Sequence, residues 1–251
     1  MNVDICKFDD KLKGAQLVTE STIVREDITI CQPEKGFRFS MDSIYLSWFV
    51  KYKKNASLVE IGAGSGVISA LLAKLKGFDR LTAIELQEVM FNCLKRTITL
   101  NELKINAVNS DIKEYKPDCE FDIAVCNPPY RDSSTGRVPK DEVELNARFT
   151  TTMHVDDVFS FCRSYLKNSG SLYLSYDADL TADLFEAGYK YGFEAKRLLP
   201  ICPEVDVKPK IVLMEFRKNV GREMSFEPPI YQKVNGEQSK ADRKIMTGEW
   251  I

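Results

Sequence analysis

The feature that most constrains the fold is a regular alternation of strand-like and helix-like segments from Leu58 to Arg217. Short runs of β-branched and aliphatic residues are separated by segments of roughly ten to fifteen residues with helical spacing of apolar positions. The predicted strands are 58–61, 81–85, 106–110, 121–126, 170–176, 193–199 and 211–217, and the predicted helices are 67–75, 87–101, 154–166 and 178–191. Strands separated by helices predict an α/β fold with a mostly parallel, doubly wound sheet of the Rossmann-like kind.

The two ends of the chain depart from this alternation. No helix separates the last two predicted strands, so they are expected to form a hairpin that places one antiparallel strand at the sheet edge. Two short strands are predicted within 22–31, and Ser40 or Asp42 is expected to begin a helix that runs to about Tyr52. We therefore expect residues 1–55 to pack on a core domain of residues 56–220, with residues 221–251 as an extended surface tail.

Composition excludes several classes of protein. Of the 251 residues, 44% are hydrophobic and 29% are charged, which is typical of a soluble globular chain. The apolar stretches are too short to span a membrane, and Met1–Asp10 is too polar for a secretory signal. The seven cysteines include no Cys-x-x-Cys pair, and His154 is the single histidine, so neither a disulfide framework nor a metal centre is expected. These features predict a cytoplasmic protein without a metal, and we expect a monomer.

A glycine-rich segment lies where the first core strand turns into a helix. It reads Glu60-Ile61-Gly62-Ala63-Gly64-Ser65-Gly66. Glycines at such a turn let the backbone approach a ligand closely, and the following helix N-terminus favours a carboxylate. A dinucleotide-binding loop would need a third glycine at position 67, where Val67 stands. The Gly-x-Gly-x-Gly spacing instead predicts a loop for S-adenosylmethionine, the alternative being an ordinary tight turn.

Acidic residues follow the next two predicted strands. Glu85, followed by Leu86, ends the second core strand, where a carboxylate can accept hydrogen bonds from both ribose hydroxyls. Asp111, followed by Ile112, comes after the third, where it can accept the adenine amino group. Each acid alone is more often a solvated cap. Their order at the ends of successive parallel strands favours a shared cofactor site, because ligands bind at those ends.

The strand 121–126 is followed directly by the tetrapeptide Asn127-Pro128-Pro129-Tyr130. The two prolines fix an extended, rigid turn, which alone would be explained as a strand terminator. The Asn127 side-chain oxygen and the Pro128 carbonyl can accept hydrogen bonds from a planar amino group and stabilise the positive charge that develops on its nitrogen. Tyr130 can stack on the flat substrate. The tetrapeptide therefore predicts methylation of an amide or exocyclic nitrogen.

With the loop, the two acids and the tetrapeptide in this order, the chain resembles the class I methyltransferases that modify planar nitrogens. The segments 32–44 (QPEKGFRFSMDSI) and 84–87 (IELQ), with a tail from Tyr231 to Gly236, are similar to those of the bacterial tRNA adenine-N6 methyltransferases. This resemblance implies a tRNA substrate, methylated at the adenine just 3′ of the anticodon of valine tRNA. It also implies that the cofactor is contacted by Phe39, Asp42, Glu60, Gly62, Ala63, Gly64, Gly66, Glu85, Leu86, Asp111, Ile112 and Asn127.

The segment after the tetrapeptide and the charge balance of the chain bear on the substrate. Arg131 and Arg137 are predicted to contact RNA from a polar segment that orders on binding, although a solvated insertion is an equal alternative. Residues 1–189 contain 23 Lys and Arg against 28 Asp and Glu, and residues 190–251 contain 12 against 9, a balance that counts mildly against nucleic acid. A protein glutamine, a guanine N2, a small molecule, or a non-catalytic cofactor-binding role remain as alternatives.

Overall fold

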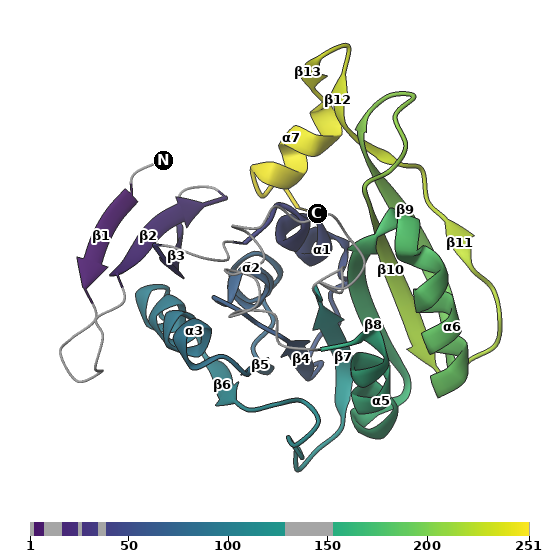
Figure 1. Ribbon diagram of the computed structural model, residues 1–251, viewed down its shortest axis with the longest axis horizontal. Helices are drawn as coiled ribbons and strands as arrows, with labels where there is room; N and C mark the ends of the chain where they lie inside the picture. The colour runs from purple at the N-terminus through teal and green to yellow at the C-terminus, as the bar shows by residue number, and fades with distance from the viewer. Residues whose placement is uncertain (1–2, 8–16, 25–26, 35–38, 129–152, 251) are drawn as a thin grey trace, which may run out of the picture.

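A mixed ten-stranded sheet forms the centre of the computed structural model, which describes residues 3–7, 17–24, 27–34, 39–128 and 153–250 (Figure 1). The strand order is β13-β12-β9-β10-β8-β7-β4-β5-β6, and β11 pairs with β9. The strands are β4 (Leu58–Ile61), β5 (Leu81–Glu85), β6 (Ile105–Asn109), β7 (Phe121–Cys126), β8 (Leu166–Asp177), β9 (Phe193–Glu204), β10 (Ile211–Lys218), β11 (Ser225–Phe226), β12 (Ile230–Val234) and β13 (Glu237–Gln238).

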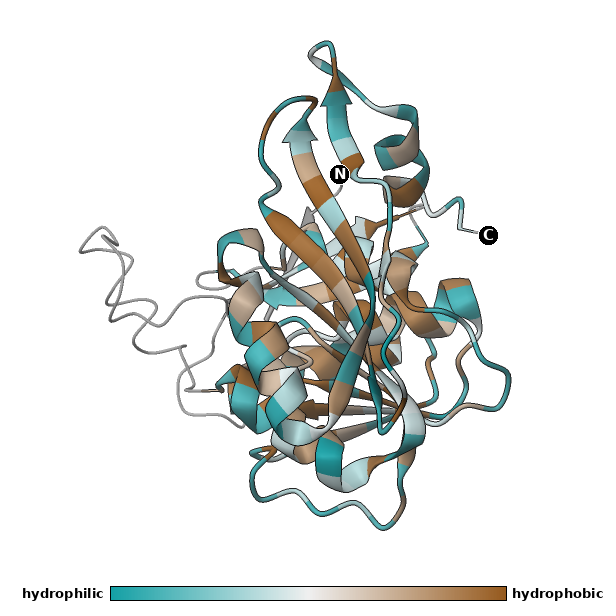
Figure 2. Ribbon diagram, turned by 90° about the vertical axis from the view of Figure 1, so that its right-hand side faces the viewer, coloured by the Kyte–Doolittle hydropathy of each residue, from teal (hydrophilic) through white to brown (hydrophobic). Residues whose placement is uncertain are grey.

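Helices cover both faces of this sheet and enclose two apolar clusters. Side chains of α1, α2 and α3 pack on one face, and those of α5 and α6 pack on the other. All four residues of β4 are buried, as expected for a central parallel strand: Leu58 packs in one cluster, and Val59 and Ile61 pack in the other. Figure 2 shows the hydrophobic residues along the inner strands and hydrophilic residues on the outer helix surfaces. The helices are α1 (Asp42–Phe49), α2 (Val67–Lys76), α3 (Glu88–Leu100), α5 (Val155–Tyr165), α6 (Thr181–Tyr191) and α7 (Lys240–Met246), with a 3-10 turn at Ala178–Leu180.

The predicted Rossmann-like fold and the β9–β10 hairpin are confirmed. The antiparallel strand β10 nevertheless lies inside the sheet rather than at its edge, because it inserts between β8 and β9 and pairs with both. The C-terminal residues add β12 to the other side of β9. Among the described helices, none is both long and apolar enough to cross a membrane.

An antiparallel sheet of β1 (Val3–Lys7), β2 (Leu17–Ile23) and β3 (Ile28–Pro33) precedes the core. Polar side chains of α3 hold the backbone of β3. Asn101 bonds both backbone groups of Thr29, and the Thr97 hydroxyl accepts the Cys31 N–H at 3.1 Å. The predicted strand pair is thus part of a three-stranded sheet fastened to α3.

The C-terminal segment differs from the extended tail that the sequence predicted. Residues 225–246 form β11, β12, β13 and α7, and α7 packs on α1. Here the buried Tyr45 of α1 donates its hydroxyl proton to Asp242 of α7, and Gln238 donates to the same carboxylate at 2.7 Å. Ile245 joins the apolar cluster beside α1. A buried hydrogen bond between Tyr45 and Asp242 supplies part of the contact between α7 and α1, so few apolar residues are needed there. The hydropathy of the sequence alone therefore does not predict that α7 packs on the core.

The two glycines that bracket α2 allow a matched test of packing at its N-terminus. Gly66 (φ +81°) and Gly77 (φ +75°) share a left-handed conformation, which costs an alanine about 1–2 kcal/mol at either position. A Cβ at Gly66 would lie 2.5 Å from Leu94 Cδ1, whereas a Cβ at Gly77 would meet nothing within 4 Å. We predict that Gly66→Ala lowers the free energy of unfolding by about 1–3 kcal/mol more than Gly77→Ala, measured by urea denaturation. Equal losses would contradict the crowding of Gly66 by Leu94.

Candidate active site

The carboxyl ends of β5, β4 and β7 meet at one edge of the sheet. In the register, Ile61 of β4 pairs with Ile84 of β5 on one side and with Cys126 of β7 on the other. The residues that follow these three partners are Gly62, Glu85 and Asn127. The glycine loop, the first acid and the tetrapeptide are therefore brought together, although they are far apart in the sequence.

The glycine loop presents its backbone toward this edge. Gly62, Gly64 and Gly66 all have positive φ (+68°, +55° and +81°). A Cβ at Gly62 would lie 3.0 Å from the Met153 methyl carbon, so this side chain lies against the loop. Ala63 is buried and donates its N–H to the Ile84 carbonyl at 2.9 Å. This hydrogen bond fixes the loop against β5. Because glycine has no side chain, the backbone of the loop carries no covering side chain of its own at its three glycine positions.

The Glu85 carboxylate joins the glycine loop to the start of α3. Its two oxygens accept the N–H groups of Gly64 and Gln87, each at 2.7 Å. Burial raises the pKa of Glu85, and these backbone N–H groups lower it in part. The next residue, Leu86, is exposed, and its carbonyl is held by Asn109 at 3.0 Å. Each Glu85 oxygen keeps a second lone pair with which it can accept a ligand hydroxyl.

The second acid lies on the same edge, after β6. Asp111 is half-buried and accepts the Lys113 N–H at 2.9 Å, which forms a local turn. The Lys113 ammonium lies 3.7 Å from the other carboxylate oxygen. Ile112 is buried in the cluster beneath α5. This places the Asp111 carboxylate near the surface and the Ile112 side chain in the core.

Glu60, the first residue of the glycine segment, is turned toward α2. One of its carboxylate oxygens accepts the Ser69 N–H at 2.9 Å and also the Ser69 hydroxyl. Full burial raises the pKa of Glu60 to about 8, although both Ser69 groups lower it. The Glu60 side chain thus fastens β4 to α2 within the interior.

The amide of Asn127 lies under the first turn of α1. Its Nδ2 donates to the Ser43 hydroxyl oxygen at 3.3 Å, and Pro128 is buried after it. Asp42 is half-buried in the same turn of α1. Phe39 packs against the core, and its N–H donates to the Gln32 side chain at 3.0 Å. Pro129, Tyr130, Arg131 and Arg137 lie outside the described residues.

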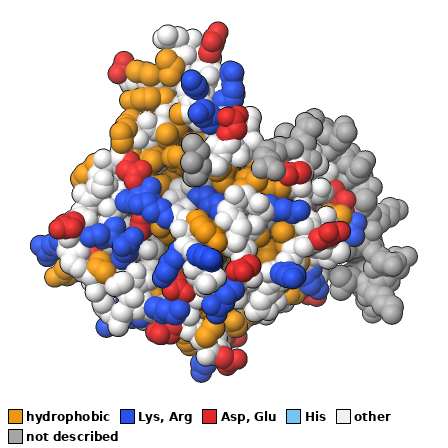
Figure 3. Space-filling model, turned by 180° about the vertical axis from the view of Figure 1, so that it is seen from behind, with side chains coloured by type: hydrophobic (Ala, Val, Ile, Leu, Met, Phe, Trp, Pro, Cys, Tyr) orange, Lys and Arg blue, Asp and Glu red, His pale blue; other side chains and the backbone are white. Residues whose placement is uncertain are grey.

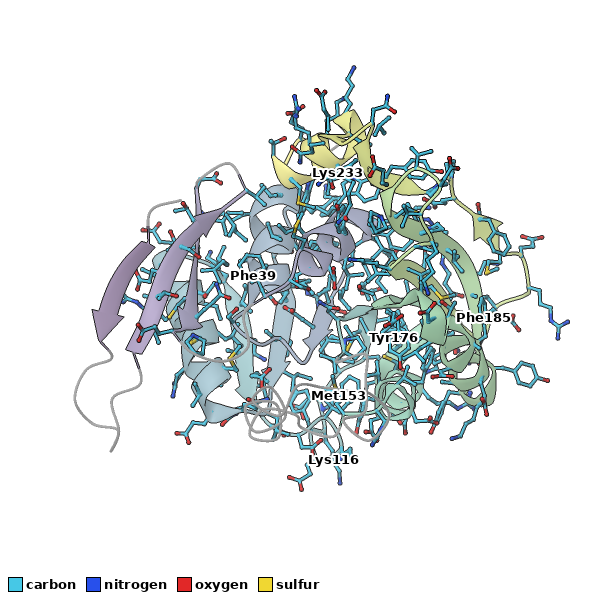
Figure 4. The ribbon with its side chains drawn as sticks, turned by 45° about the horizontal axis from the view of Figure 1, so that its top comes forward. Phe39, Lys116, Met153, Tyr176, Phe185 and Lys233 are labelled. Atoms are coloured by element: carbon cyan, nitrogen blue, oxygen red, sulfur yellow. The ribbon has the colours of Figure 1, made fainter. Side chains whose placement is uncertain are left out.

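Two contacts at this edge, those of Ser43 and Met153, were not predicted. Figure 4 labels the side chains of Met153 and Phe39, which come from distant parts of the chain. Ser43 stands inside the segment that resembles the tRNA enzymes, but nothing in its spacing indicates that it meets Asn127. Met153 follows a polar stretch and carries no pattern that points to the loop.

The described residues fit S-adenosylmethionine. At its three glycines the loop backbone carries no side chains, Met153 lies against Gly62, and Glu85 supplies an acceptor for hydroxyl groups. Of the six α-helices that the structure describes, only α2 has no acidic residue in its first turn. Its positive dipole end is therefore left for a ligand carboxylate. Within the described ranges no group of His, Cys, Asp and Glu could hold a metal ion.

The model of the methyltransferase small-domain family matches residues 43–183, which is more than half of the chain. The chain belongs to this family. It is a methyltransferase that uses S-adenosylmethionine, and the glycine loop and Glu85 lie within the matched residues. The predicted resemblance to methyltransferases is thereby confirmed.

Individual relatives are more distant. The chain is 22% identical, over 74% of its length and 77% of the other's, to the tRNA1(Val) (adenine(37)-N6)-methyltransferase of Vibrio campbellii. It is 27% identical, over 59% of its length and 58% of the other's, to the release factor glutamine methyltransferase of Flavobacterium psychrophilum. The fold is similar to that of a predicted O-methyltransferase from Agrobacterium tumefaciens, with a TM-score of 0.67, 17% identity and coverage of 83% and 96% of the two chains.

Glu60 should make stability depend on pH. The folded protein holds the Glu60 proton up to about pH 8, whereas the ordinary pKa is 4.5. Between these values the folded state binds more protons than the unfolded state. The contribution of Glu60 to the free energy of unfolding is therefore fully present below about pH 4.5. As the pH rises toward 8, the free energy of unfolding falls by about 1.4 kcal/mol per pH unit.

We therefore predict that Glu60→Gln, which mimics the protonated side chain, gains stability relative to the wild type between pH 5 and pH 8. Urea denaturation across this range measures the difference. Glu114→Gln, at an exposed position, serves as the control and should follow the wild type. Parallel curves for Glu60→Gln and the wild type would contradict the raised pKa.

Glu85 should contribute directly to cofactor affinity. Hydrogen bonds to a charged group are worth about 1.5–3 kcal/mol, so we predict that Glu85→Gln weakens binding of S-adenosylhomocysteine about 10-fold or more. Isothermal titration calorimetry measures this affinity. Glu88→Gln, in the exposed first turn of α3, is the matched control and should bind as the wild type does. Unchanged affinity of Glu85→Gln would remove Glu85 from the cofactor site.

Proposed function

We propose that this methyltransferase methylates the N6 amino group of an adenine in tRNA, with valine tRNA next to the anticodon as the expected position. The observation that carries the proposal is the position of Asn127 and Pro128 directly after β7, beside the glycine loop after β4. Residues 56–220 would form the catalytic domain. Of the cofactor residues predicted from the sequence, those that would line its carboxyl edge are Gly62, Ala63, Gly64, Gly66, Glu85, Leu86, Asp111 and Asn127, with Phe39 and Asp42 contributed by the preceding residues.

The chemistry at this edge requires hydrogen-bond acceptors rather than a strong base. S-adenosylmethionine, when bound, supplies a methyl group activated by a sulfonium. An exocyclic amine is a weak nucleophile because its lone pair is delocalised into the ring. The Asn127 Oδ1 and the Pro128 carbonyl would accept its two N–H groups, favour a pyramidal nitrogen and stabilise the growing positive charge. The proton can leave after methyl transfer, so no histidine is needed.

The identity of the substrate rests on the relatives and on the sequence. A relative named as a tRNA adenine-N6 methyltransferase matches 74% of the chain, more than the glutamine methyltransferase does. Stacking of Tyr130 on the adenine and contacts of Arg131 and Arg137 with RNA remain predictions from the sequence. Phosphate contacts of this kind would make binding weaken steeply with salt.

A protein glutamine is the second candidate substrate, since its side-chain amide is also planar. Its support is the relative that acts on release factors and the charge of the carboxyl edge. The first turns of α5 and α6 carry Asp157 and Asp183, which disfavour a nearby phosphate backbone, while the charge of Asp156 is offset by Lys190 at 2.5 Å. Figure 3 shows that Lys and Arg side chains are spread across the face seen from behind the view of Figure 1, with Asp and Glu among them.

Label transfer from S-adenosylmethionine distinguishes the two candidates. The protein would be incubated with bulk tRNA and, separately, with total protein from cells lacking the enzyme. Labelled RNA would be digested and its nucleosides identified by mass. We predict label in N6-methyladenosine, and we predict that Asn127→Ala loses at least 100-fold in rate because it removes one of two acceptors in the transition state.

The outcomes separate the proposals. Label only in protein, recovered as N5-methylglutamine, would replace tRNA by the second candidate. Label in neither pool, with S-adenosylhomocysteine still bound, would contradict both. Full activity of Asn127→Ala would refute the acceptor role of Asn127, whatever the substrate.

A further inference from the structure

The amide of Asn127 is supported by a side chain from a distant helix. Ser43 stands in the first turn of α1, 84 residues before Asn127, and its hydroxyl oxygen accepts the Asn127 Nδ2–H at 3.3 Å. Ser43 is only 6% exposed, so water does not readily replace it. A hydrogen bond between two such distant residues reflects how α1 crosses the end of β7.

The orientation of this amide matters for the reaction. An asparagine side chain has an acceptor oxygen on one side and a donor NH2 on the other. A substrate amino group offers hydrogen atoms to its acceptors, so Oδ1 must face it and Nδ2 must point away. In the structure Nδ2 faces the Ser43 hydroxyl, so Oδ1 lies on the side of the amide opposite this contact.

Helix α1 is a rigid support for this contact. Tyr45 is bonded to Asp242 of α7, and the Ser47 hydroxyl donates to the Ser43 carbonyl at 2.7 Å. At the other end of the helix, Lys76 donates to the carbonyls of Trp48 and Val50. Both ends of α1 are thereby fixed, and functional groups on such elements are placed more accurately than groups on loops.

We infer that Ser43 is a positioning residue for methyl transfer: its hydroxyl oxygen holds the Asn127 NH2 so that Oδ1 faces the acceptor nitrogen of the substrate. This inference rests on the proposed role of Asn127. In this role Ser43 acts on the reaction through Asn127.

The kinetic test compares two serines of the same helix. Ser43→Ala removes the hydroxyl oxygen that accepts the Asn127 Nδ2–H. Ser47→Ala removes a buried hydroxyl one turn further along, which within the described part of the chain bonds the helix backbone. On the substrate labelled by the wild type, Ser43→Ala is expected to lower kcat about 10-fold. Its KM and its affinity for S-adenosylhomocysteine should stay within twofold of the wild type, and Ser47→Ala should keep kcat as well.

A spectroscopic test does not depend on activity. In protein with 15N-labelled asparagine, the Asn127 side-chain NH2 resonance is identified by its absence in Asn127→Asp. Loss of the hydrogen bond in Ser43→Ala should shift this resonance, while Ser47→Ala should leave it in place. The shift is expected with S-adenosylhomocysteine bound and without any substrate.

The two tests keep the inference separate from the proposed function. An unmoved resonance in Ser43→Ala would overturn the contact itself. A shifted resonance with unchanged kcat would overturn the positioning role. Equal losses of kcat in Ser43→Ala and Ser47→Ala would assign the effect to the stability of α1 and would also overturn it. Failure of the wild type to label RNA or protein contradicts the proposed function, and the resonance then still decides whether Ser43 holds Asn127.

Discussion

The buried carboxylate of Glu85 is the interaction on which the geometry of this active site depends. It accepts one backbone N–H from the glycine loop after β4 and one from the start of α3, each at 2.7 Å. A loop with three positive-φ glycines has large conformational freedom in the unfolded chain, so its shape has to be fixed by contacts of this kind. Both contacts come from the chain itself, and a loop that is held by such contacts loses less conformational entropy when it binds a ligand.

Topology brings the second half of the site to this loop. Since β4 is flanked by β5 and β7 in parallel register, the glycine loop has the acid on one side and Asn127 on the other. Helix α1 then closes over Asn127, and the C-terminal segment fastens α1 through Tyr45 and Asp242. The C-terminal strands and α7 thus support the active site from a distance, because the helix that they hold also carries Ser43.

Local patterns were sufficient to predict the sheet, most of its helices and the loop, because these depend on residues close together in the sequence. The position of β12 beside β9 was not predictable, since its only apolar signal is short and its pairing partner lies about 30 residues earlier. The contact between Ser43 and Asn127 depends on the path of α1 across the sheet, which no periodicity encodes. Glu60 shows the reverse case, because its place in the glycine segment suggested a cofactor contact, whereas alternation along β4 turns its side chain to Ser69 of α2.

The two halves of the site constrain function to different degrees. In the proposed site, the cofactor half would be built from the ends of β4 and β5, and its requirements follow from one ligand, so proteins with different substrates can share it. The acceptor half would be built from the residues after β7 and from α1, and it would require only a planar nitrogen with hydrogen atoms to donate. An adenine amine and a glutamine amide both meet that requirement. Discrimination between them must therefore come from groups that contact the rest of the substrate, where a phosphate backbone and a peptide differ most in charge.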